Sequence, residues 1–456
     1  LNALANGAVA VVSEDSRPPD VLAPWVTVPD ARFALGHLAA YFRGFPSRRL
    51  GLIGVTGTDG KTTTAHLIAS ILDAAGLPVG LTSTVYFRLG SEIRANRTGH
   101  STPPPAILQD LLASMVEQGL RWAVLEVTSH AIDQMRIAGC EFDIGVFTNL
   151  TPEHLNCHGD FDHYRQTKAQ LFSSLGRETK PNIPTFGVFN LDDPSSREMR
   201  AGCSVEHVTY GIDGDVAYRV TEFQTGLTGT TISLSTPNGP LQLWTPLAGR
   251  FNVYNVSAAC AVALRIGISA DVVRQAVKEF TGVPGRLQEV DEGQPFKLFV
   301  DFAHTPNALS VTLKELRSAT RGRLIIVFGH AGGRDLETRR GLGRVAATMS
   351  DVAIITTDDP CDEDPREIID QIEDGIRSAS RSRDNVVLRI VDRGNAIERA
   401  VQMARAGDTV LIAGRGHEDY MIVRGRKIPF NDLDVARRSV AFAYPTKSRS
   451  PRVSAA

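Results

Sequence analysis

The chain has 456 residues, of which 42% are hydrophobic and 22% charged, and its formal net charge is −2. These proportions are ordinary for soluble globular proteins, and they exclude a mainly disordered or collagen-like chain. The near-neutral charge argues against a nucleic-acid partner, because nucleic-acid-binding domains usually carry a strongly basic face. At roughly 150 residues per domain, the length predicts about three domains.

No stretch of the sequence approaches the ~18 uninterrupted apolar residues of a membrane span. The first residues lack the basic and apolar regions of a secretion signal. Five scattered cysteines without a Cys-x-x-Cys pair indicate reduced thiols rather than a disulfide framework or a zinc site. We therefore expect a cytoplasmic protein that does not insert into membranes.

The chain starts in a way that predicts an incomplete first domain. It begins at Leu1, and residues 7–13 form an apolar run typical of a buried strand entered partway through a fold. We therefore expect residues 1–48 to be the remnant of an N-terminal domain.

From residue 49 onwards, apolar strands alternate with segments of helical periodicity. The expected strands are 50–56, 122–127 and 142–148, and the expected helices are 61–75, 105–118 and 160–175. This alternation is typical of a parallel α/β sheet. It predicts a central domain at 49–283, in which the Thr-, Ser- and Gly-rich segment 205–246 adds antiparallel strands.

A second alternating series begins after a Gly- and Pro-containing boundary at 282–286. Its strands are expected at 298–301, 324–328, 352–356 and 410–413. The series predicts a smaller α/β domain at 284–444, and the polar tail at 445–456 is expected to be disordered.

A phosphate-binding loop is expected at Thr56–Thr64, between the first strand and the first helix of the central domain. Backbone N–H groups and the helix N-terminus can cradle a polyphosphate there, and Lys61 can reach its β and γ oxygens. The loop departs from the G-x-x-x-x-G-K-[ST] pattern, because Val55 stands where the first glycine is expected. A glycine turn that merely starts a helix would explain the glycines, but not the Lys-Thr-Thr that follows them.

Two polar side chains follow buried strands, at the positions where ligand crevices of open α/β sheets form. Glu126 ends an apolar strand, where a charge is costly unless it is paired or binds a metal such as Mg²⁺. The alternative is that Glu126 caps Ser129 or the following helix. His154 follows another strand end, although a lone histidine more often has no special role.

Lys168 shares one helical stripe with Tyr164, Leu171, Phe172 and Leu175. An inward-facing lysine either extends its ammonium group to the rim or is chemically modified or part of an ion site. The spacing alone leaves both interpretations open.

Three polar, glycine-bearing loops follow strands of the second series, at 301–306, 329–335 and 414–419. Each of them alone could be an ordinary turn. Together they exceed what a structural sheet edge needs, which indicates that they face a ligand.

Several motifs, taken in order, resemble the Mur ligase family, and within it the UDP-N-acetylmuramoyl-tripeptide synthetases. The resemblance runs from the first residues to about residue 443. Its most specific stretches are Gly54-Val-Thr-Gly-Thr-Asp-Gly-Lys-Thr-Thr63, Leu125-Glu-Val-Thr-Ser-His130, His154-Leu-Asn-Cys-His-Gly159, Gly249-Arg-Phe-Asn-Val-Tyr-Asn255, Asp301-Phe-Ala-His-Thr-Pro306 and Gly414-Arg-Gly-His-Glu-Asp-Tyr420.

The resemblance implies an α/β fold of three-domain Mur ligase architecture, with a P-loop central α/β domain and a C-terminal Rossmann-like α/β domain. It implies a ligase that uses ATP and Mg²⁺ to add a diamino acid (meso-diaminopimelate, L-lysine or ornithine) to UDP-MurNAc-L-Ala-D-Glu in peptidoglycan synthesis. ATP would phosphorylate the D-glutamyl carboxylate, and the amine would then displace phosphate. The expected partners are the UDP-MurNAc-dipeptide and a free diamino acid, bound by a monomer.

The resemblance also implies roles for individual residues. The catalytic and metal-binding groups would be Lys61, Thr62, Glu126, His154 and Lys168, with Lys168 carbamoylated. The ATP contacts would be Gly57, Thr58, Asp59, Gly60, Lys61, Thr62, Thr63, Asn252, Arg286, Asp301 and His304. The UDP-dipeptide contacts would be Thr102, Ser129, Gln134 and Arg136, and the diamino-acid contacts would be Arg334, Asp359, Gly414 and Glu418, whose carboxylate would pair with the ammonium group.

Two motifs depart from the family pattern. The diaminopimelate pattern Asp-Asn-Pro-Arg appears as Asp358-Asp-Pro-Cys361, so Cys361 replaces an arginine fork for the distal carboxylate. Losing such a partner costs roughly a few kcal/mol, so L-lysine or ornithine becomes plausible unless Arg339 or a neighbour substitutes. The usual Asp-His-Leu-Asp appears as Glu153-His-Leu-Asn156, a change that the site is expected to tolerate.

Two alternatives stay open. A related ligase such as folylpolyglutamate synthetase would share the phosphate loop and the inward lysine, but not the motifs around Asp359 and Glu418. A catalytically dead nucleotide-binding fragment is compatible with a chain that begins at Leu1.

Overall fold

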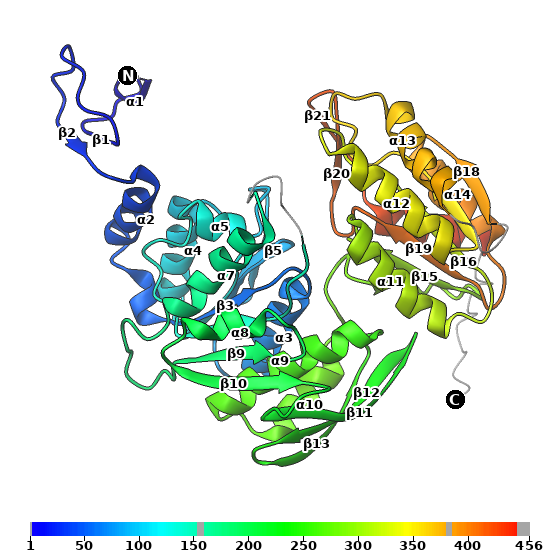
Figure 1. The fold of residues 1–456 in the computed structure, drawn as a ribbon, viewed down its shortest axis with the longest axis horizontal. Helices are drawn as coiled ribbons and strands as arrows, with labels where there is room; N and C mark the ends of the chain where they lie inside the picture. Colours follow the sequence, from blue (N-terminus) through cyan, green and yellow to red (C-terminus); the bar gives the residue numbers. More distant parts are fainter. Residues whose placement is uncertain (1, 153–158, 380–384, 445–456) are drawn as a thin grey trace, which may run out of the picture. The chain divides into compact units, whose positions relative to one another are not determined.

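The structure is a computed structural model that describes residues 2–152, 159–379 and 385–444. These residues form two compact units (Figure 1). Unit 1 runs from the start of the described chain to Gln224 and includes Thr231–Thr245 and Phe251–Phe280; unit 2 comprises Thr225–Thr230, Pro246–Arg250 and the described residues from Thr281 onwards. The domain boundaries expected from the sequence stay predictions, and the expected tail at 445–456 lies outside the described residues.

Among the described residues, an eleven-stranded sheet organises unit 1. In sheet order its strands are β13 (Gly239–Thr245), β12 (Gly229–Thr236), β11 (Tyr218–Gly226), β10 (Glu206–Gly211), β9 (Phe186–Asn190), β8 (Ile144–Phe147), β3 (Gly51–Thr56), β7 (Trp122–Glu126), β4 (Val79–Thr82), β5 (Tyr86–Leu89) and β6 (Glu92–Ala95). The strands from β10 to β4 run parallel, whereas β4–β5 and β5–β6 are antiparallel. The parallel α/β prediction is therefore confirmed.

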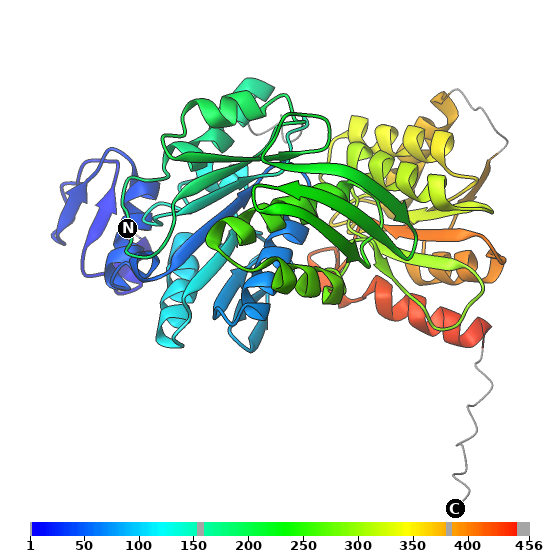
Figure 2. The same ribbon diagram turned by 90° about the horizontal axis from the view of Figure 1, so that it is seen from below.

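Segment 205–246 continues this sheet as strands β10 to β13, which lie side by side in green in Figure 2. β11, β12 and β13 are sheet neighbours joined by two-residue links, and such short links connect antiparallel strands. The short links indicate the expected antiparallel order for these three strands. The antiparallel prediction is wrong for β10, which pairs parallel with both β9 and β11.

The helices that accompany this sheet are α2 (Ala31–Phe42), α3 (Lys61–Ala74), α4 (Pro105–Glu117), α5 (Ser129–Asp133), α7 (Phe161–Ser173), α8 (Ser196–Ala201), α9 (Arg250–Ile266), α10 (Ala270–Glu279) and the short 3-10 helix η1 (Pro46–Arg49). Every residue of β3 is buried, because helices cover both faces of the parallel part of the sheet. The carboxyl end of β3 therefore opens directly onto the loop before α3.

The buried strand expected at 7–13 is wrong in both length and burial. The structure has a short helix α1 (Asn2–Ala5) and a strand β1 (Val11–Ser13) that pairs only with β2 (Trp25–Thr27). Val9 is 86% exposed and Val12 is 39% exposed. An apolar run is buried only when another layer covers it, and a two-stranded sheet is too small to supply that cover itself.

Unit 2 contains a six-stranded sheet with helices on both faces. In sheet order the strands are β14 (Gln288–Glu289), β15 (Lys297–Asp301), β19 (Thr409–Ala413), β16 (Leu324–Phe328), β17 (Val352–Ile355) and β18 (Val386–Arg389). All neighbours except β14 pair in parallel. A hairpin of β20 (Tyr420–Val423) and β21 (Arg426–Pro429) follows β19.

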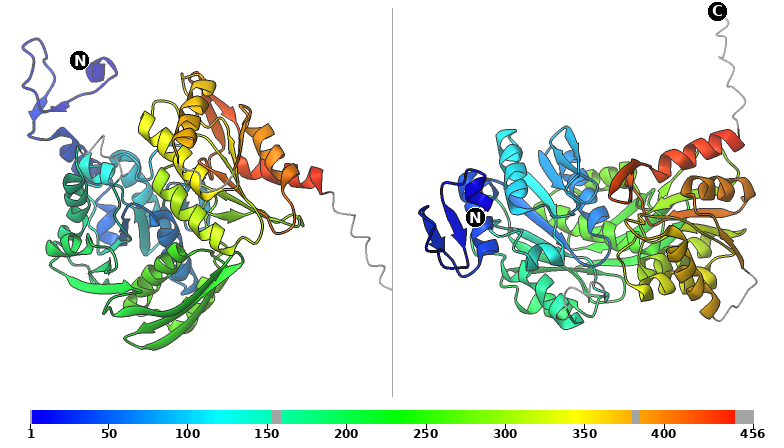
Figure 3. Two further views of the ribbon diagram at one scale, coloured as in Figure 1. Left: turned by 45° about the vertical axis from the view of Figure 1, so that its right-hand side comes forward. Right: turned by 90° about the horizontal axis from the view of Figure 1, so that it is seen from above.

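Two apolar clusters cover the two faces of this sheet. One cluster joins Leu309, Leu342 and Ile369 of α11 (Pro306–Ala319), α12 (Leu336–Met349) and α13 (Pro365–Ser378). The other joins Ile397 and Val440 of α14 (Arg393–Met403) and α15 (Asp432–Ala443). Figure 3 shows the yellow helices on one face and the orange and red helices on the other. The doubly covered parallel sheet confirms the second α/β series, and its polar loops share one edge.

No helix in the described part of the chain is both long and apolar enough to cross a lipid bilayer.

Candidate active site

The phosphate loop lies between β3 and α3, as the sequence predicts. α3 begins after Gly60, which has φ +81° and provides no side-chain cap, so the backbone N–H groups of the first turn face the loop. Gly57, with φ +146°, could not carry a Cβ atom, since that atom would lie 2.0 Å from Thr148 Oγ1. The loop is further fixed by a hydrogen bond from the Thr58 N–H to the Asn149 carbonyl oxygen at 2.8 Å. This geometry suits the close approach of an anion to the backbone.

Two lysines converge on the carbonyl oxygen of Gly57. Lys61 Nζ donates to the Gly57 carbonyl at 3.0 Å and to the Thr58 carbonyl at 2.6 Å. Lys168 Nζ donates to the Gly57 carbonyl at 2.8 Å and lies 4.7 Å from the ring centre of Tyr164. Lys168 is only 1% exposed, so the interpretation that its ammonium group extends to the protein rim is wrong.

Glu126 is fully buried at the end of β7, with both carboxylate oxygens engaged. Thr62 Oγ1 donates to its Oε2 at 3.0 Å, while Thr84 donates through N–H to Oε1 at 2.7 Å and through Oγ1 to Oε2 at 3.0 Å. The capping alternative is wrong, because Thr128 caps α5. One carboxylate and two hydroxyls form a set of hard oxygen donors, which fits Mg²⁺. The other expected metal ligand, His154, lies outside the described residues.

Three of the expected dipeptide contacts lie together beside Glu126. Thr102 Oγ1 donates to the Glu126 carbonyl oxygen at 2.7 Å, and Arg136 Nη1 donates to the Thr102 carbonyl oxygen at 3.2 Å. Arg136 also holds the Gln134 side-chain oxygen, at 2.6 Å from Nη2. Ser129 is buried at the start of α5.

Asn252 reaches the phosphate loop through Asn255, one turn further along α9. Asn255 Nδ2 donates to Asn252 Oδ1 at 2.9 Å, and Asn255 Oδ1 accepts from Thr64 Oγ1 at 3.2 Å. A Cβ atom on Gly60 would lie 2.3 Å from Asn255 Oδ1, so Asn255 packs directly on the loop. The sequence prediction named Asn252 and missed Asn255.

In unit 2, the three expected ATP contacts gather around Phe302. The Arg286 guanidinium lies 4.4 Å from the Phe302 ring centre, and His304 Nδ1 bonds the Phe302 carbonyl oxygen at 2.9 Å. Asp301 accepts from the Leu287 N–H at 2.6 Å. Burial raises the pKa of Asp301, although the Arg286 charge opposes this rise.

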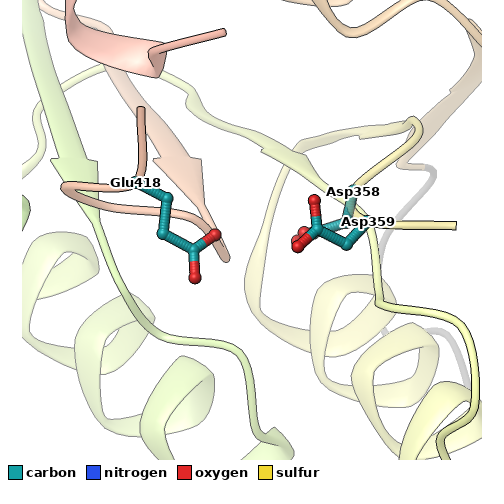
Figure 4. Close-up of side chains that lie close together, drawn as sticks. All are labelled: Asp358, Asp359 and Glu418. Atoms are coloured by element: carbon teal, nitrogen blue, oxygen red, sulfur yellow. The ribbon is translucent and has the colours of Figure 1, made fainter. Parts of the chain in front are cut away.

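A second cluster in unit 2 surrounds the fully buried guanidinium of Arg415. Its Nη1 lies 3.0 Å from Asp358 Oδ1 and 2.6 Å from Asp359 Oδ1, and its Nη2 lies 3.3 Å from Glu418 Oε2. Figure 4 shows Asp358 and Asp359 on one segment and Glu418 on another. Oxygens of the three carboxylates lie within 4.8 Å of one another. Gly414 adjoins them, since a Cβ atom there would lie 2.7 Å from Asp358 Oδ2.

Burial and charge act in opposite directions on this cluster. Burial raises the pKa of Glu418 to about 8 against the Arg415 charge, and Asp358 and Asp359 raise it further. Burial alone would lower the pKa of Arg415, but Asp358, Glu418 and Asp359 hold it above its ordinary value. Three carboxyl groups around one cation can still accept a second cation, such as an ammonium group.

The residues near Cys361 bear on the replaced arginine. Arg339 is 3% exposed and forms a two-point bridge with Glu363, at 2.7 and 3.0 Å, and it also donates to Gln371. The Nη1 and Nη2 groups of Arg339 therefore already have partners within the protein. Arg334 is exposed and close to Cys361: burial raises the pKa of the Cys361 thiol, and the Arg334 charge opposes that rise.

Sequence reasoning gave no role to Thr84 or Arg415. Thr84 stands just after β4, so its strand-end position was the available signal. Arg415 lies inside the recognised 414–420 motif, but only the fold reveals its buried contacts with residues 358 and 359.

Comparison with known proteins identifies the family. Residues 55–263 match the Mur ligase middle domain, and residues 285–416 match the Mur ligase glutamate ligase domain. The chain is 41% identical over 440 residues to the UDP-N-acetylmuramoyl-L-alanyl-D-glutamate–2,6-diaminopimelate ligase of Geobacillus thermodenitrificans, covering 96% of this chain and 88% of that protein. The chain belongs to the Mur ligase family. It is therefore an ATP-dependent, amide-bond-forming ligase, as the motifs predicted.

Other Mur ligases show the same relation. The protein of the same name from Geobacter metallireducens is 38% identical over 452 residues, covering 96% of this chain and 87% of that protein. A solved structure of a 2,6-diaminopimelate ligase of this kind superimposes with a TM-score of 0.67 at 32% identity, covering 96% of this chain and 88% of that one. These matches confirm the predicted Mur ligase fold.

The folylpolyglutamate synthase of Mycobacterium tuberculosis superimposes with a TM-score of 0.66 at 17% identity, covering 84% of this chain and 92% of that one. At this identity the likeness shows a shared fold alone.

Proposed function

We propose that this Mur ligase joins a free diamino acid to the D-glutamyl carboxylate of UDP-MurNAc-L-Ala-D-Glu in peptidoglycan synthesis. The observation that carries the proposal is the 41% identity, over 96% of the chain, to a relative named for this ligation. The site geometry supports it, because unit 1 has a phosphate loop with hard oxygen donors and unit 2 has a carboxylate cluster suited to an amine.

Unit 1 supplies the groups for ATP. The α3 N-terminus and Lys61 bind its phosphates, together with Gly57, Thr58, Asp59, Gly60 and Thr63, and Asn252 supports the loop through Asn255. Thr62 and Glu126 hold Mg²⁺, which when bound neutralises negative charge on the phosphates. In unit 2, Arg286, Asp301 and His304 add ATP contacts, with Arg286 orienting a phosphate.

The reaction needs two steps, because a free carboxylate is a poor electrophile. The D-glutamyl carboxylate attacks the γ-phosphorus of ATP, which gives an acyl phosphate and releases ADP. The diamino acid's neutral amine then attacks the acyl carbon; the amide C–N bond forms, phosphate leaves with the C–O bond electrons, and the proton lost from the nitrogen passes to the departing phosphate. Lys168, held against the phosphate loop, is the residue we assign to carbamoylation, which would convert its cation into a metal-positioning anion.

The dipeptide and amino-acid contacts divide between the units. Thr102, Ser129, Gln134 and Arg136 bind the UDP-dipeptide in unit 1. Arg334, Asp359, Gly414 and Glu418 bind the diamino acid in unit 2, where Glu418 pairs with its ammonium group.

The named relatives make meso-diaminopimelate the first candidate amine. L-Lysine or ornithine is the second candidate, because Cys361 offers no cation and Arg339 is bound to Glu363. Arg334 is exposed and could bind a distal carboxylate. Meso-diaminopimelate has such a carboxylate, whereas lysine and ornithine do not.

The experiment measures phosphate release by the protein with ATP, Mg²⁺ and UDP-MurNAc-L-Ala-D-Glu, with each of the three diamino acids in turn. We expect release with one of them, which identifies the amine, and Arg334→Ala then tests how that amine is bound. If the amine is meso-diaminopimelate, the variant should raise its KM roughly tenfold or more, because a charged hydrogen bond is lost; if it is lysine or ornithine, which has no distal carboxylate, KM should stay nearly unchanged. Silence with all three amines in a protein that binds ATP would overturn the proposal in favour of a nucleotide-binding protein without this activity.

We also propose a cytoplasmic monomer, for which light scattering should return the mass of one chain.

A further inference from the structure

Arg393 and Asp432 form a completely buried ion pair in unit 2 that has no part in the proposed chemistry. Each is the first residue of its helix, α14 or α15, and both side chains are 0% exposed. Arg393 Nε donates to Asp432 Oδ1 at 2.7 Å, and Nη2 donates to Oδ2 at 2.7 Å. Well-packed apolar residues often stabilise a fold as well as such a pair does, so the pair by itself is weak evidence of a stabilising role.

The remaining Arg393 donors bond two backbone carbonyls at the ligand-facing edge of the sheet. Nη2 donates to the Ala413 carbonyl oxygen at 2.9 Å, and Nη1 donates to the Thr357 carbonyl oxygen at 3.3 Å. Ala413 ends β19 and Thr357 follows β17, and β16 separates these strands in the sheet. Arg393 therefore links two strand ends that the sheet hydrogen bonds do not join directly.

These two carbonyls immediately precede the residues of the carboxylate cluster. Asp358 and Asp359 follow Thr357, whereas Gly414 and Arg415 follow Ala413. The two segments meet closely, since Arg415 Nη1 lies 2.6 Å from Asp359 Oδ1. The distance between the carbonyls thus constrains where the carboxylates stand relative to Arg415.

The residues just before Asp432 bond the loop that carries Glu418. Asn431 donates from Nδ2 to the Glu418 carbonyl oxygen at 3.1 Å, and the Phe430 N–H donates to the Asp419 carbonyl oxygen at 3.0 Å. Asn431, at the start of α15, therefore bonds the backbone of Glu418, and the next residue, Asp432, bonds Arg393. Through these contacts and the bond from Arg393 to the Thr357 carbonyl oxygen, the segments that carry all three acidic residues contact this pair or its chain neighbour.

We propose that Arg393 and Asp432 are positioning residues: they set the spacing of Asp358, Asp359 and Glu418 but do not contact the diamino acid. This inference rests on the proposed function, because it takes that cluster as the amino-acid site. A group that acts only on this spacing should change binding of the diamino acid and leave binding of ATP unaffected.

The test compares Arg393→Lys with Arg323→Lys, a control in the same unit whose arginine also bonds an aspartate but is 34% exposed. Arg323 also forms a fork with an aspartate, at 2.7 and 3.1 Å from Asp408 Oδ2, and donates to the Met403 carbonyl oxygen at 2.6 Å, but it precedes β16 at the opposite edge of the sheet. We expect Arg393→Lys to raise KM for the diamino acid about tenfold or more, since small displacements of binding groups are costly. KM for ATP should change less than about twofold, and Arg323→Lys should change neither.

A second variant, Arg393→Met with Asp432→Leu, removes both charges and leaves no unpaired ion to unfold the protein. It should show the same selective rise in KM for the diamino acid. An unchanged KM in folded variants, equal losses for both substrates, or failure of both variants to fold would each make the pair purely structural and overturn this inference. Absence of turnover by the unmodified protein would instead show that the proposed function fails, and the inference would fall with it.

Discussion

At the scale of the residue, Glu418 shows how the fold adjusts a charge for a binding task. Burial raises its pKa to about 8, even though Arg415 lies 3.3 Å away and opposes the shift. A protonated carboxyl group cannot pair fully with an ammonium group, so diamino-acid binding should require that Glu418 loses its proton.

We expect KM for the diamino acid to fall as the pH rises through about 8, because the carboxylate becomes available over that range. Steady-state rates measured across this interval test the expectation. Glu418→Gln should have a high KM with little pH dependence, whereas Glu398→Gln, an exposed position on α14, should behave like the unmodified protein. A pH profile that survives in Glu418→Gln would assign the titration to another group.

The same shift affects stability with a definite sign. The pKa of folded Glu418 lies above its ordinary value of 4.5, so the folded protein prefers the protonated form. The resulting stabilisation is complete below pH 4.5 and is lost as the pH rises through about 8. Glu418→Gln, which cannot ionise, should escape this loss, a difference that chemical unfolding at several pH values would detect.

Much of the unit 1 site could be predicted from single residues. Lys168 shared an apolar helical stripe and Glu126 ended an apolar strand, and both are buried beside the phosphate loop. Thr84 and Asn255 could not be ranked in the same way, because their importance depends on contacts with Glu126 and Thr64. A hydroxyl or amide group near a strand or helix is too common to identify a site.

At the scale of the element, the glycine at the start of α3 differs from the glycine that follows the helix in what surrounds it. Gly60 has φ +81°, and a Cβ atom there would lie 2.3 Å from Asn255 Oδ1. Gly76, just after the same helix, has φ +69°, but a Cβ atom there would meet nothing within 4 Å. A side chain at either position would strain the left-handed backbone, but only a side chain at Gly60 would also collide with Asn255.

We expect Gly60→Ala to raise KM for ATP roughly tenfold or more, because the collision displaces the first N–H groups of α3. Gly76→Ala should leave KM for ATP unchanged while carrying a similar left-handed backbone cost of about 1–2 kcal/mol. Kinetics and thermal unfolding of both variants provide the comparison. Equal KM values for ATP in the two variants would show that contact with Asn255 does not determine how the phosphate loop binds ATP.

At the scale of the whole molecule, the two units have separate cores and carry different parts of the proposed chemistry. A ligand stabilises the folded region that it binds, by an amount set by its concentration and affinity. Most of the proposed ATP contacts are in unit 1, and all of the proposed diamino-acid contacts are in unit 2. Differential scanning calorimetry should therefore show ATP with Mg²⁺ raising mainly the transition of unit 1, and the diamino acid raising only that of unit 2. A single transition, moved equally by either ligand, would mean that the units unfold together.

The sequence by itself determined the two α/β series, the phosphate loop, the inward lysine and the family, because these depend on patterns within short segments. It also suggested a buried first strand, which was wrong because burial depends on a covering layer. Only the tertiary structure decided which polar groups meet. Arg415 and Asp358 are 57 residues apart, and Arg393 and Asp432 are 39 residues apart. Such pairs form where strand ends and helix starts converge at one sheet edge, and no local pattern records that convergence.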